Sequence, residues 1–195
     1  MSKKCYRFFG GLLNTQEKWL NKMSEKGYRL VRTGKLLYEF EKCKPDEVTY
    51  CVEFIGEKSK ESSIDYANFL KDMGYKVFFK NINLNDSVGK VRWRPWAERG
   101  GRIATNTTTF NREILIAEKT NDGKPFELHT SYDDKEKYYR NLRNPWLFLL
   151  LMFALFAVTK QSIIFGIFAL VSVIPGSIYQ IQIMKIRKEA KTQEW

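Results

Sequence analysis

Histidine is almost missing from this sequence, and cysteine is scarce. The 195 residues contain one histidine, His129, so a metal site built from several histidines is excluded, and any Ser-His or Cys-His pair would depend on this residue. The three cysteines, Cys5, Cys43 and Cys51, have no C-x-x-C spacing, which disfavours zinc sites and disulfide frameworks and agrees with a reducing compartment. We therefore expect no metal site and no cofactor.

Two sequence signals are also absent. No G-x-x-x-x-G-K-[ST] pattern occurs, which excludes a phosphate-binding loop of that type. Residues 1–11 contain lysines but no apolar core as long as a secretory signal peptide requires. Because the residues form no recognisable catalytic constellation, we expect a protein that is not an enzyme.

The charge is mostly of one sign and is unevenly distributed. Lys and Arg number 33 against 22 Asp and Glu, which gives a formal charge of +11. A hydrophobic share of 44% and an aromatic share of 15% exclude a disordered chain. The mean hydropathy of −0.42 conceals a stretch from residue 145 to residue 184 whose one charged residue is Lys160.

Two apolar runs, 146–158 and 163–183, make up this stretch. One continuous helix would be about 60 Å long, twice the hydrocarbon thickness of a bilayer, and would place Lys160 near its centre at a cost of roughly 2.5–3.5 kcal/mol. A helical hairpin places Lys160 in the turn, at the far membrane interface. We therefore predict a two-helix transmembrane hairpin over 145–184, and the alternative is a helical hairpin buried in a soluble core.

Basic residues flank the outer ends of both runs and predict the orientation. Seven of them precede the first run or follow the second, whereas Lys160 alone marks the turn. Because cytoplasmic flanks are enriched in Lys and Arg, we expect an inner (plasma) membrane protein with two spans and both termini in the cytoplasm. The seven are Lys137, Arg140, Arg143, Lys185, Arg187, Lys188 and Lys191; the expected membrane-anchoring residues are Trp146, Lys160, Lys185, Arg187 and Lys188.

Residues 1–80 predict an α+β domain. Apolar and polar residues alternate along 36–40 and 48–54, with Thr49, Cys51 and Glu53 on the solvent face of the second strand. Strands at 5–9 and 75–79 and two helices complete the order β-α-β-β-β-α-β. This order predicts a ferredoxin-like sandwich with an extra strand and with its helices on one face of the sheet.

The two predicted helices end in a similar way. Gly27-Tyr28 follows the first and Gly74-Tyr75 follows the second, and each pair leads into a strand, which is a weak internal repeat. A glycine here supplies the left-handed conformation that closes a helix. The second helix also has four apolar residues on one face, which we expect to lie in the core: Tyr66, Phe69, Leu70 and Met73.

Residues 81–131 predict a basic loop and a β-hairpin extension, in which strands at 114–119 and 126–130 flank a turn at 121–123. A charged juxtamembrane helix at 132–144 leads into the transmembrane hairpin, and a basic cytosolic tail follows at 185–195.

The segment 90–102 combines five basic residues with one acidic residue and two tryptophans. Basic side chains neutralise phosphates, and indoles stack on bases or lie at lipid headgroups. We expect either a strand and loop with the tryptophans in the core, or a surface for an anionic lipid, an acidic partner or, less favoured, a nucleic acid. The candidate anionic-partner-binding residues are Lys90, Arg92, Trp93, Arg94, Trp96, Arg99 and Arg102.

Several stretches of the chain resemble a known family. The run E-K-W-L-N-K-M-S-E-K-G-Y-x-L from Glu17, followed by Y-x-F-E-x-C-x-P from Tyr38 and Y-x-V-E from Tyr50, is similar to a family of bacterial membrane proteins defined only as a domain of unknown function. The later E-L-H-T-x-Y from Glu127 also matches. The resemblance implies carboxy-terminal membrane helices and a gene that often lies beside one for a PadR-like transcriptional regulator. It implies no catalytic residues.

These patterns predict a membrane-tethered regulatory or adaptor protein whose cytosolic domain binds a protein partner, for which the resemblance nominates a PadR-like regulator. The alternative is a membrane-bound binder of anionic lipid or nucleic acid that uses the segment 90–102. A further alternative is an enzyme or a component of a transporter complex, in which a pocket would gather His129 or the glutamates Glu39, Glu41 and Glu53.

Overall fold

The computed structural model describes residues 3–98, 101–105, 111–128 and 132–193. The chain forms two compact units, Met1–His129 and Thr130–Trp195. The first unit contains β1 (Lys3–Tyr6), α1 (Leu13–Glu25), β2 (Tyr28–Thr33), β3 (Leu37–Lys42), β4 (Val48–Phe54), α2 (Lys60–Asp72), β5 (Lys76–Lys80), β6 (Asp86–Val88), β7 (Val91–Trp93), β8 (Ile103–Ala104) and β9 (Ile114–Thr120). The second unit contains α3 (Tyr132–Thr159) and α4 (Ile163–Gln193).

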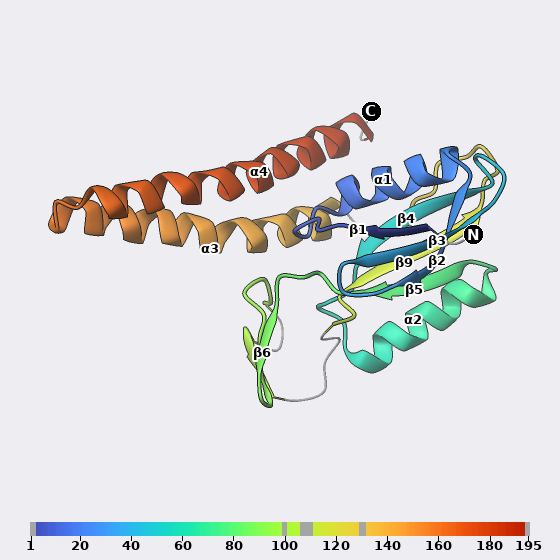
Figure 1. The fold of residues 1–195 in the computed structure, drawn as a ribbon, viewed down its shortest axis with the longest axis horizontal. Coiled ribbons are helices and arrows are strands. Elements are labelled where there is room, and N and C mark those ends of the chain that lie inside the picture. Colours follow the sequence, from blue (N-terminus) through green and yellow to red (C-terminus); the bar gives the residue numbers. More distant parts are fainter. Residues whose placement is uncertain (1–2, 99–100, 106–110, 129–131, 194–195) are drawn as a thin grey trace. The chain divides into compact units, whose positions relative to one another are not determined.

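Two three-stranded sheets of the first unit share one plan. In sheet A, β3 lies between β1 and β2 and is antiparallel to both; in sheet B, β9 lies between β4 and β5 and is antiparallel to both. Each of the helices α1 and α2 therefore connects two parallel strands that flank an antiparallel one. Figure 1 shows α1 above the strands and α2 below them.

The predicted α+β class and the predicted element order from β1 to β5 match these elements, and a ferredoxin-like arrangement is not confirmed. The strands are divided between separate sheets, the two helices cover opposite sides, and β9 from beyond residue 80 fills the centre of sheet B. Of the hairpin expected around 121–123, the structure describes one strand, β9, which pairs with β4 and β5; residues 121–128 contain no strand, and residues 129 and 130 of the expected second strand lie outside the described residues.

Polar side chains of α1 cover the outer edge of β4. They hydrogen-bond backbone groups at every second residue of the strand, which meets the rule that an exposed strand edge must be covered or paired. Because α1 presents these side chains at intervals of one helical turn, they match the two-residue repeat of the strand. The bonds join Glu17 to the N–H of Val52 (2.9 Å), Asn21 to the N–H (2.7 Å) and C=O (3.1 Å) of Tyr50, and Ser24 to the C=O of Val48 (2.5 Å).

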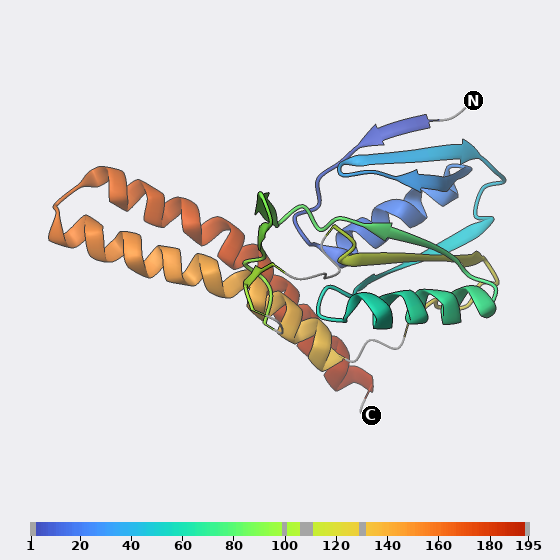
Figure 2. The same ribbon diagram turned by 90° about the horizontal axis from the view of Figure 1, so that it is seen from below.

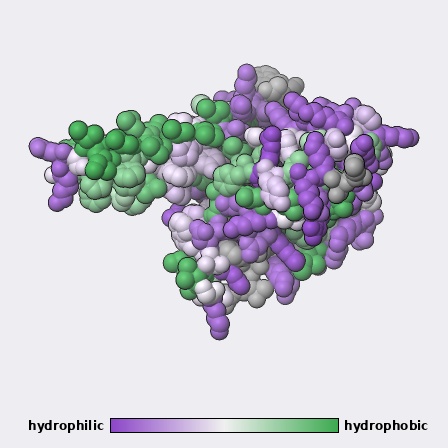
Figure 3. Space-filling model, in the orientation of Figure 1, coloured by the Kyte–Doolittle hydropathy of each residue, from purple (hydrophilic) through white to green (hydrophobic). Residues whose placement is uncertain are grey.

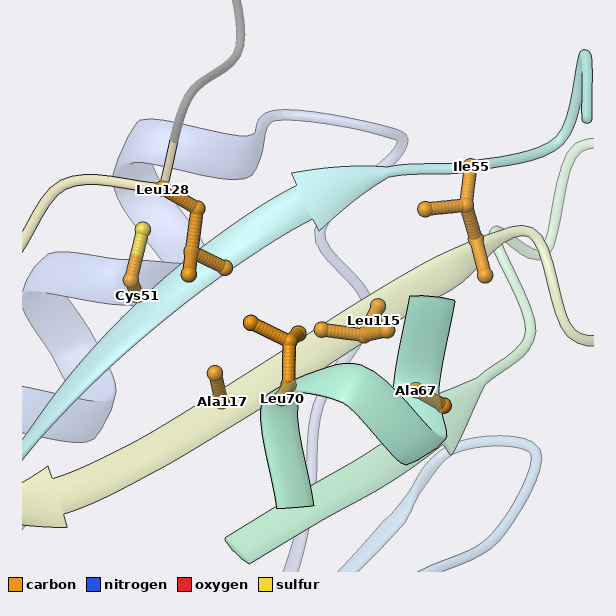
Figure 4. Packing of buried hydrophobic residues seen from close by; sticks show 7 residues of the cluster. All are labelled: Cys51, Ile55, Ala67, Leu70, Leu115, Ala117 and Leu128. Carbon is orange, nitrogen blue, oxygen red and sulfur yellow. The ribbon is translucent and has the colours of Figure 1, made fainter. Parts of the chain in front are cut away.

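One face of sheet B packs against α2 around Leu70 and Leu115, as Figure 4 shows. Cys51 belongs to this cluster and is 7% exposed, and the neighbouring Glu53 is equally buried and accepts a 2.7 Å hydrogen bond from Tyr66 Oη. The expectation that Cys51 and Glu53 face solvent is therefore wrong. Both faces of β4 are covered, so the alternation of apolar and polar residues along this strand does not separate a solvent-exposed face from a buried one.

Buried polar side chains join sheets A and B. Tyr50 of β4 donates its hydroxyl hydrogen to Glu118 of β9 (2.9 Å) and accepts a hydrogen bond from the N–H of Leu30 in β2 (2.7 Å). Arg29 of β2 forms a salt bridge with the same glutamate at 2.7 Å. The buried carboxylate of Glu118 thus has both a cation and a hydroxyl as partners, which offsets the cost of removing it from water.

The internal repeat at the helix ends corresponds to a repeated backbone geometry. Gly27 and Gly74 have φ angles of +74° and +86°, the left-handed conformation that glycine adopts without strain. A Cβ on Gly27 would also lie 2.9 Å from the carbonyl oxygen of Cys43, so this position has no room for a side chain. The expected core face of α2 is confirmed for Leu70 but not for Phe69 and Met73, which are 57% and 46% exposed.

The second unit is an antiparallel pair of long helices (Figures 1 and 2). Near the turn, Phe153 contacts Phe165 and Phe168 with ring centroids 6.4 and 5.5 Å apart. Further along, a Cβ added to Gly176 would lie 3.8 Å from Cβ of Trp146, so the two helices approach closely there. Both helices continue through their internal prolines, at positions 145 and 175.

Most apolar side chains of this pair point away from it. Leu151, Val158 and Ile163 are 70%, 77% and 82% exposed, and only 6% and 22% of the most apolar 18-residue windows of α3 and α4 are buried within the chain. Figure 3 shows hydrophobic residues along most of the hairpin, with hydrophilic ones at its turn. The described residues thus contain two helices that are long and apolar enough to cross a membrane, and they lack the burial of a core hairpin in a soluble domain.

We predict that Asn21→Ala lowers the free energy of unfolding of the first unit by about 1–3 kcal/mol, because it leaves a buried N–H and C=O of Tyr50 without partners. Urea unfolding of the detergent-solubilised chain, followed by tryptophan fluorescence, measures this change. The adjacent exposed Lys22→Ala is the control and should change stability by no more than about 0.5 kcal/mol. Equal effects of the two substitutions would show that α1 does not protect the edge of β4.

Candidate functional site

Most of the predicted anionic-partner-binding residues lie on or beside a third sheet, sheet C, which consists of β6, β7 and β8 in that order. Val88 pairs with Val91 across the first two strands, and Trp93 pairs with Ile103 across the last two. The sheet is too small to be stable alone, so its position depends on contacts with the rest of the first unit.

Trp96 supplies the main contact between the segment of sheet C and the rest of the first unit. Its side chain is 2% exposed, and its ring meets that of Phe54, at the end of β4, edge to face at a centroid distance of 5.1 Å. A Cβ on Gly56 would lie 2.8 Å from the Trp96 ring, so the absence of a side chain at Gly56 makes room for the indole. Arg94 is 3% exposed, stacks 5.5 Å from the Trp96 ring centroid and donates a 2.9 Å hydrogen bond to the carbonyl of Gly101.

The predicted residues therefore divide into two groups. Trp96 is buried, as the interpretation with core tryptophans expects; Arg94 is buried as well, which that interpretation did not expect, and neither side chain can contact a ligand at the surface. Trp93 is half exposed, and Lys90 and Arg102 are exposed. Arg92 is half-buried, and Arg99 lies outside the described residues.

Four of the five predicted membrane-anchoring residues lie toward the two ends of the hairpin, and the fifth, Trp146, lies near the middle of α3. Lys160 is exposed in the turn between α3 and α4. Lys185, Arg187 and Lys188 are exposed near the C-terminal end of α4, whereas Trp146 is half-buried near the close approach of the helices.

Glu136 of α3, which the sequence interpretation did not single out, pairs with this basic end. The guanidinium of Arg187 donates two hydrogen bonds to its carboxylate, at 3.0 and 2.8 Å, and Arg140 forms a second salt bridge with it. A bidentate arrangement of this kind fixes the register of the two helices at their basic ends.

A polar cleft of about 610 Å³ in the first unit was also missed by the sequence interpretation. It lies between the β2–β3 turn and the segment that follows β5, and its volume is typical of small-molecule sites. Its lining residues are Thr33, Gly34, Lys35, Phe79, Lys80, Asn81, Asn85, Asp86, Ser87 and Asn111. One signal for it was present in the sequence, the alternating asparagines of N-I-N-L-N at 81–85.

Two buried ionisable residues hold the walls of this cleft: Lys80 lines it, and Glu113 lies behind the lining residues Asn85 and Asn111. Glu113 is fully buried, and its carboxylate accepts hydrogen bonds from the N–H of Ile82 (3.2 Å), from Asn85 Nδ2 (2.6 Å) and from the N–H of Asn111. Burial raises the pKa of Glu113 to about 7, and these hydrogen bonds oppose the rise. Glu113 thus ties the start of β9 to the segment after β5.

Lys80, at the end of β5, ties this strand to the β2–β3 turn on the other side of the cleft. It is 2% exposed, and its ammonium donates hydrogen bonds to the carbonyls of Gly34 (2.7 Å) and Lys35. Burial lowers the pKa of Lys80 to about 8, while the charge of Glu113 raises it. The ammonium also lies 5.0 Å from the ring centroid of Tyr38.

No metal cluster is present in the described part of the chain, and the cleft does not gather the glutamates that the enzyme or transporter alternative requires. No group of three or more His, Cys, Asp and Glu side chains within residues 3–98, 101–105, 111–128 and 132–193 is arranged to hold a metal ion. Glu39 pairs with Arg32 at the surface, Glu53 bonds Tyr66, and neither glutamate lines the cleft. His129 lies outside the described residues.

A family model described as "Protein of unknown function (DUF2812)" matches residues 13–151. The chain belongs to the DUF2812 family. The match begins at α1 and ends within α3, so the DUF2812 region includes sheets B and C, the strands β2 and β3 of sheet A, and the first part of the hairpin, whereas β1 precedes it. No curated protein and no solved structure matches the chain.

We predict that Glu113 makes the stability of this DUF2812 protein depend on pH. Because the folded-state pKa of about 7 lies above the ordinary value of 4.5, the native state holds more protons between these values, and the free energy of unfolding falls as the pH rises from 4.5 to 7. Glu113→Gln cannot titrate, so it should remove up to roughly 3 kcal/mol of this fall. Urea unfolding at several pH values measures both slopes.

The exposed Glu127→Gln is the matched control and should leave the wild-type slope in place. A Glu113→Gln variant that keeps the full wild-type slope between pH 4.5 and 7 would contradict this assignment.

Proposed function

We propose that this DUF2812 protein is a membrane-tethered adaptor or regulatory protein, in which the α3–α4 hairpin is the anchor and the first unit binds another protein. The observation that carries the proposal is the exposed apolar surface of the hairpin. In the most apolar 18-residue windows of α3 and α4, only 6% and 22% of the window is buried within the chain. Such a surface is stable in lipid and costly in water.

The charges at the hairpin ends support an orientation with both termini in the cytoplasm. Lys160 is alone in the turn, whereas eight basic residues of the two helices, the seven named above and Lys135, lie at the opposite end of the helix pair, before residue 145 or after residue 184. The first unit would then lie on the cytoplasmic side, where the small number of cysteines and the lack of C-x-x-C spacing agree with a reducing environment.

The outer edge of β1 is the surface of the first unit that we assign to a protein partner. In the described part of the chain β3 is the only strand paired with β1, and Tyr6 and Phe8 beside this edge are 72% and 61% exposed. An open edge can receive an extended segment of a partner through backbone hydrogen bonds, with apolar side chains giving specificity. The basic residues Lys3 and Lys4 favour an acidic segment.

A PadR-like transcriptional regulator is the partner that we propose, because the family resemblance implies neighbouring genes. In this function the hairpin would hold the regulator at the membrane, and release from the β1 edge would free it for DNA. The proposal needs no catalytic residue in this chain.

We predict that a photo-crosslinking phenylalanine analogue at Phe8, introduced into the full chain in intact membranes, gives a covalent product with a second protein. The same analogue at Phe69 on α2 is the control, since the two phenylalanines are similarly exposed, at 61% and 57%. Mass spectrometry of the product identifies the partner. Products of the same kind from both positions, or none from either, would contradict the assignment of the β1 edge.

A further inference from the structure

Sheet C has its apolar side turned outward. Val91 and Trp93 are two residues apart in β7 and so share one face, and the paired residues Val88 and Ile103 lie on the same face. These four residues, which we call the apolar face, are 83% (Val88), 44% (Val91), 50% (Trp93) and 67% (Ile103) exposed. Figure 3 shows hydrophobic residues at the surface over β6.

The opposite side of sheet C is partly covered by the rest of the first unit, although Ser87 of β6 on that side is exposed. Ala104, which pairs with Arg92 across β7 and β8, is 7% exposed, and Arg92 is half-buried. A one-sided antiparallel sheet ordinarily presents polar residues to water, so the reversed pattern indicates that the apolar face has a contact outside the first unit.

The charges around the apolar face are mainly positive. Lys90 lies in the β6–β7 turn and Arg102 directly precedes β8, and both are exposed. One acidic residue, Asp86, shares the face through its pairing with Trp93. An exposed indole between aliphatic side chains, with cations at the rim, is the composition of a segment that lies at the headgroup level of an anionic bilayer.

We propose that the apolar face of sheet C inserts into the headgroup region of an anionic membrane leaflet, with Lys90 and Arg102 on the lipid phosphates. This contact rests on the membrane anchoring proposed above, because the hairpin keeps sheet C at a high effective concentration near the bilayer. A nucleic acid fits less well, since one exposed indole among three aliphatic side chains offers little surface for base stacking.

The contact is tested with the full chain reconstituted into vesicles of phosphatidylcholine, with or without phosphatidylglycerol. All three native cysteines are replaced and Val88→Cys carries an environment-sensitive NBD fluorophore. In vesicles with phosphatidylglycerol we expect a blue-shifted emission and quenching by spin-labelled lipid. The same label at Glu61→Cys, an exposed position on α2, should report water in both vesicles.

Charge variants test the role of the two cations. Lys90→Gln with Arg102→Gln should lower the ratio of inserted to free sheet C about thirtyfold, since each cation near an anionic leaflet contributes a factor of roughly five. The control Lys71→Gln with Lys124→Gln removes the same charge from other exposed positions of the first unit and should leave the ratio unchanged.

Flotation of the chain with the vesicles separates the two proposals. A chain that floats while the Val88 label stays in water overturns the insertion of sheet C and leaves the anchor standing, whereas a chain that does not float overturns both. Insertion that is equal in both vesicles, or salt-sensitive binding of an added oligonucleotide without any response to phosphatidylglycerol, also overturns the assignment to anionic lipid.

Discussion

Everything proposed for this chain depends on the apolar surface that α3 and α4 leave uncovered. Each Leu, Ile, Val or Phe on this surface favours insertion by about 0.3–0.6 kcal/mol, and a helix satisfies its own backbone groups in lipid. Two polar side chains within the helices follow the same rule, since Thr159 and Ser172 donate hydrogen bonds to carbonyls of their own helices at 2.9 Å. One continuous helix would place the charged Lys160 in the middle of the membrane. The turn between α3 and α4 avoids this, because it contains Lys160.

The first unit depends on a second constraint, which is that strand edges and buried charges must find partners. α1 covers the edge of β4 with side-chain hydrogen bonds, and Glu118, Glu113 and Lys80 each bond groups from neighbouring strands or turns. These bonds, rather than apolar packing alone, set how sheets A and B meet. The outer edge of β1 and the apolar face of sheet C lack such partners within the described residues, which is why both were assigned to external contacts.

Local patterns in the sequence predicted much of the fold, and long-range pairing set the limit. The helix ends at Gly27 and Gly74, the strands around Tyr38 and Tyr50, and the break between the two apolar helices all follow from signals within about ten residues. The place of β9 between β4 and β5 does not, because its partners are more than thirty residues away in the chain. That pairing, together with α2, is also what buries Cys51 and Glu53.

The candidate sites also depend partly on local sequence signals and partly on contacts between residues far apart in the chain. The composition of segment 90–102 indicated a basic and aromatic surface. Trp93 and Trp96 have similar neighbours in the sequence, but Trp93 is half exposed and Trp96 is buried. Trp96 is buried because Gly56, some forty residues earlier, leaves space beside Phe54, and no local pattern reports this. The cleft around Lys80 and Glu113 likewise joins three separate segments, so only the run of asparagines at 81–85 could have drawn attention to it.

The most direct test of the membrane anchor is the accessibility of single cysteines at the two ends of the hairpin. In a chain without native cysteines, Thr159→Cys lies beside the turn and Glu189→Cys near the end of α4, and both positions are exposed. In right-side-out membrane vesicles, a membrane-impermeant maleimide should label Thr159→Cys at once and Glu189→Cys only after permeabilisation. Equal labelling of both positions before permeabilisation, or recovery of the chain in the soluble fraction, would contradict a hairpin that crosses the bilayer.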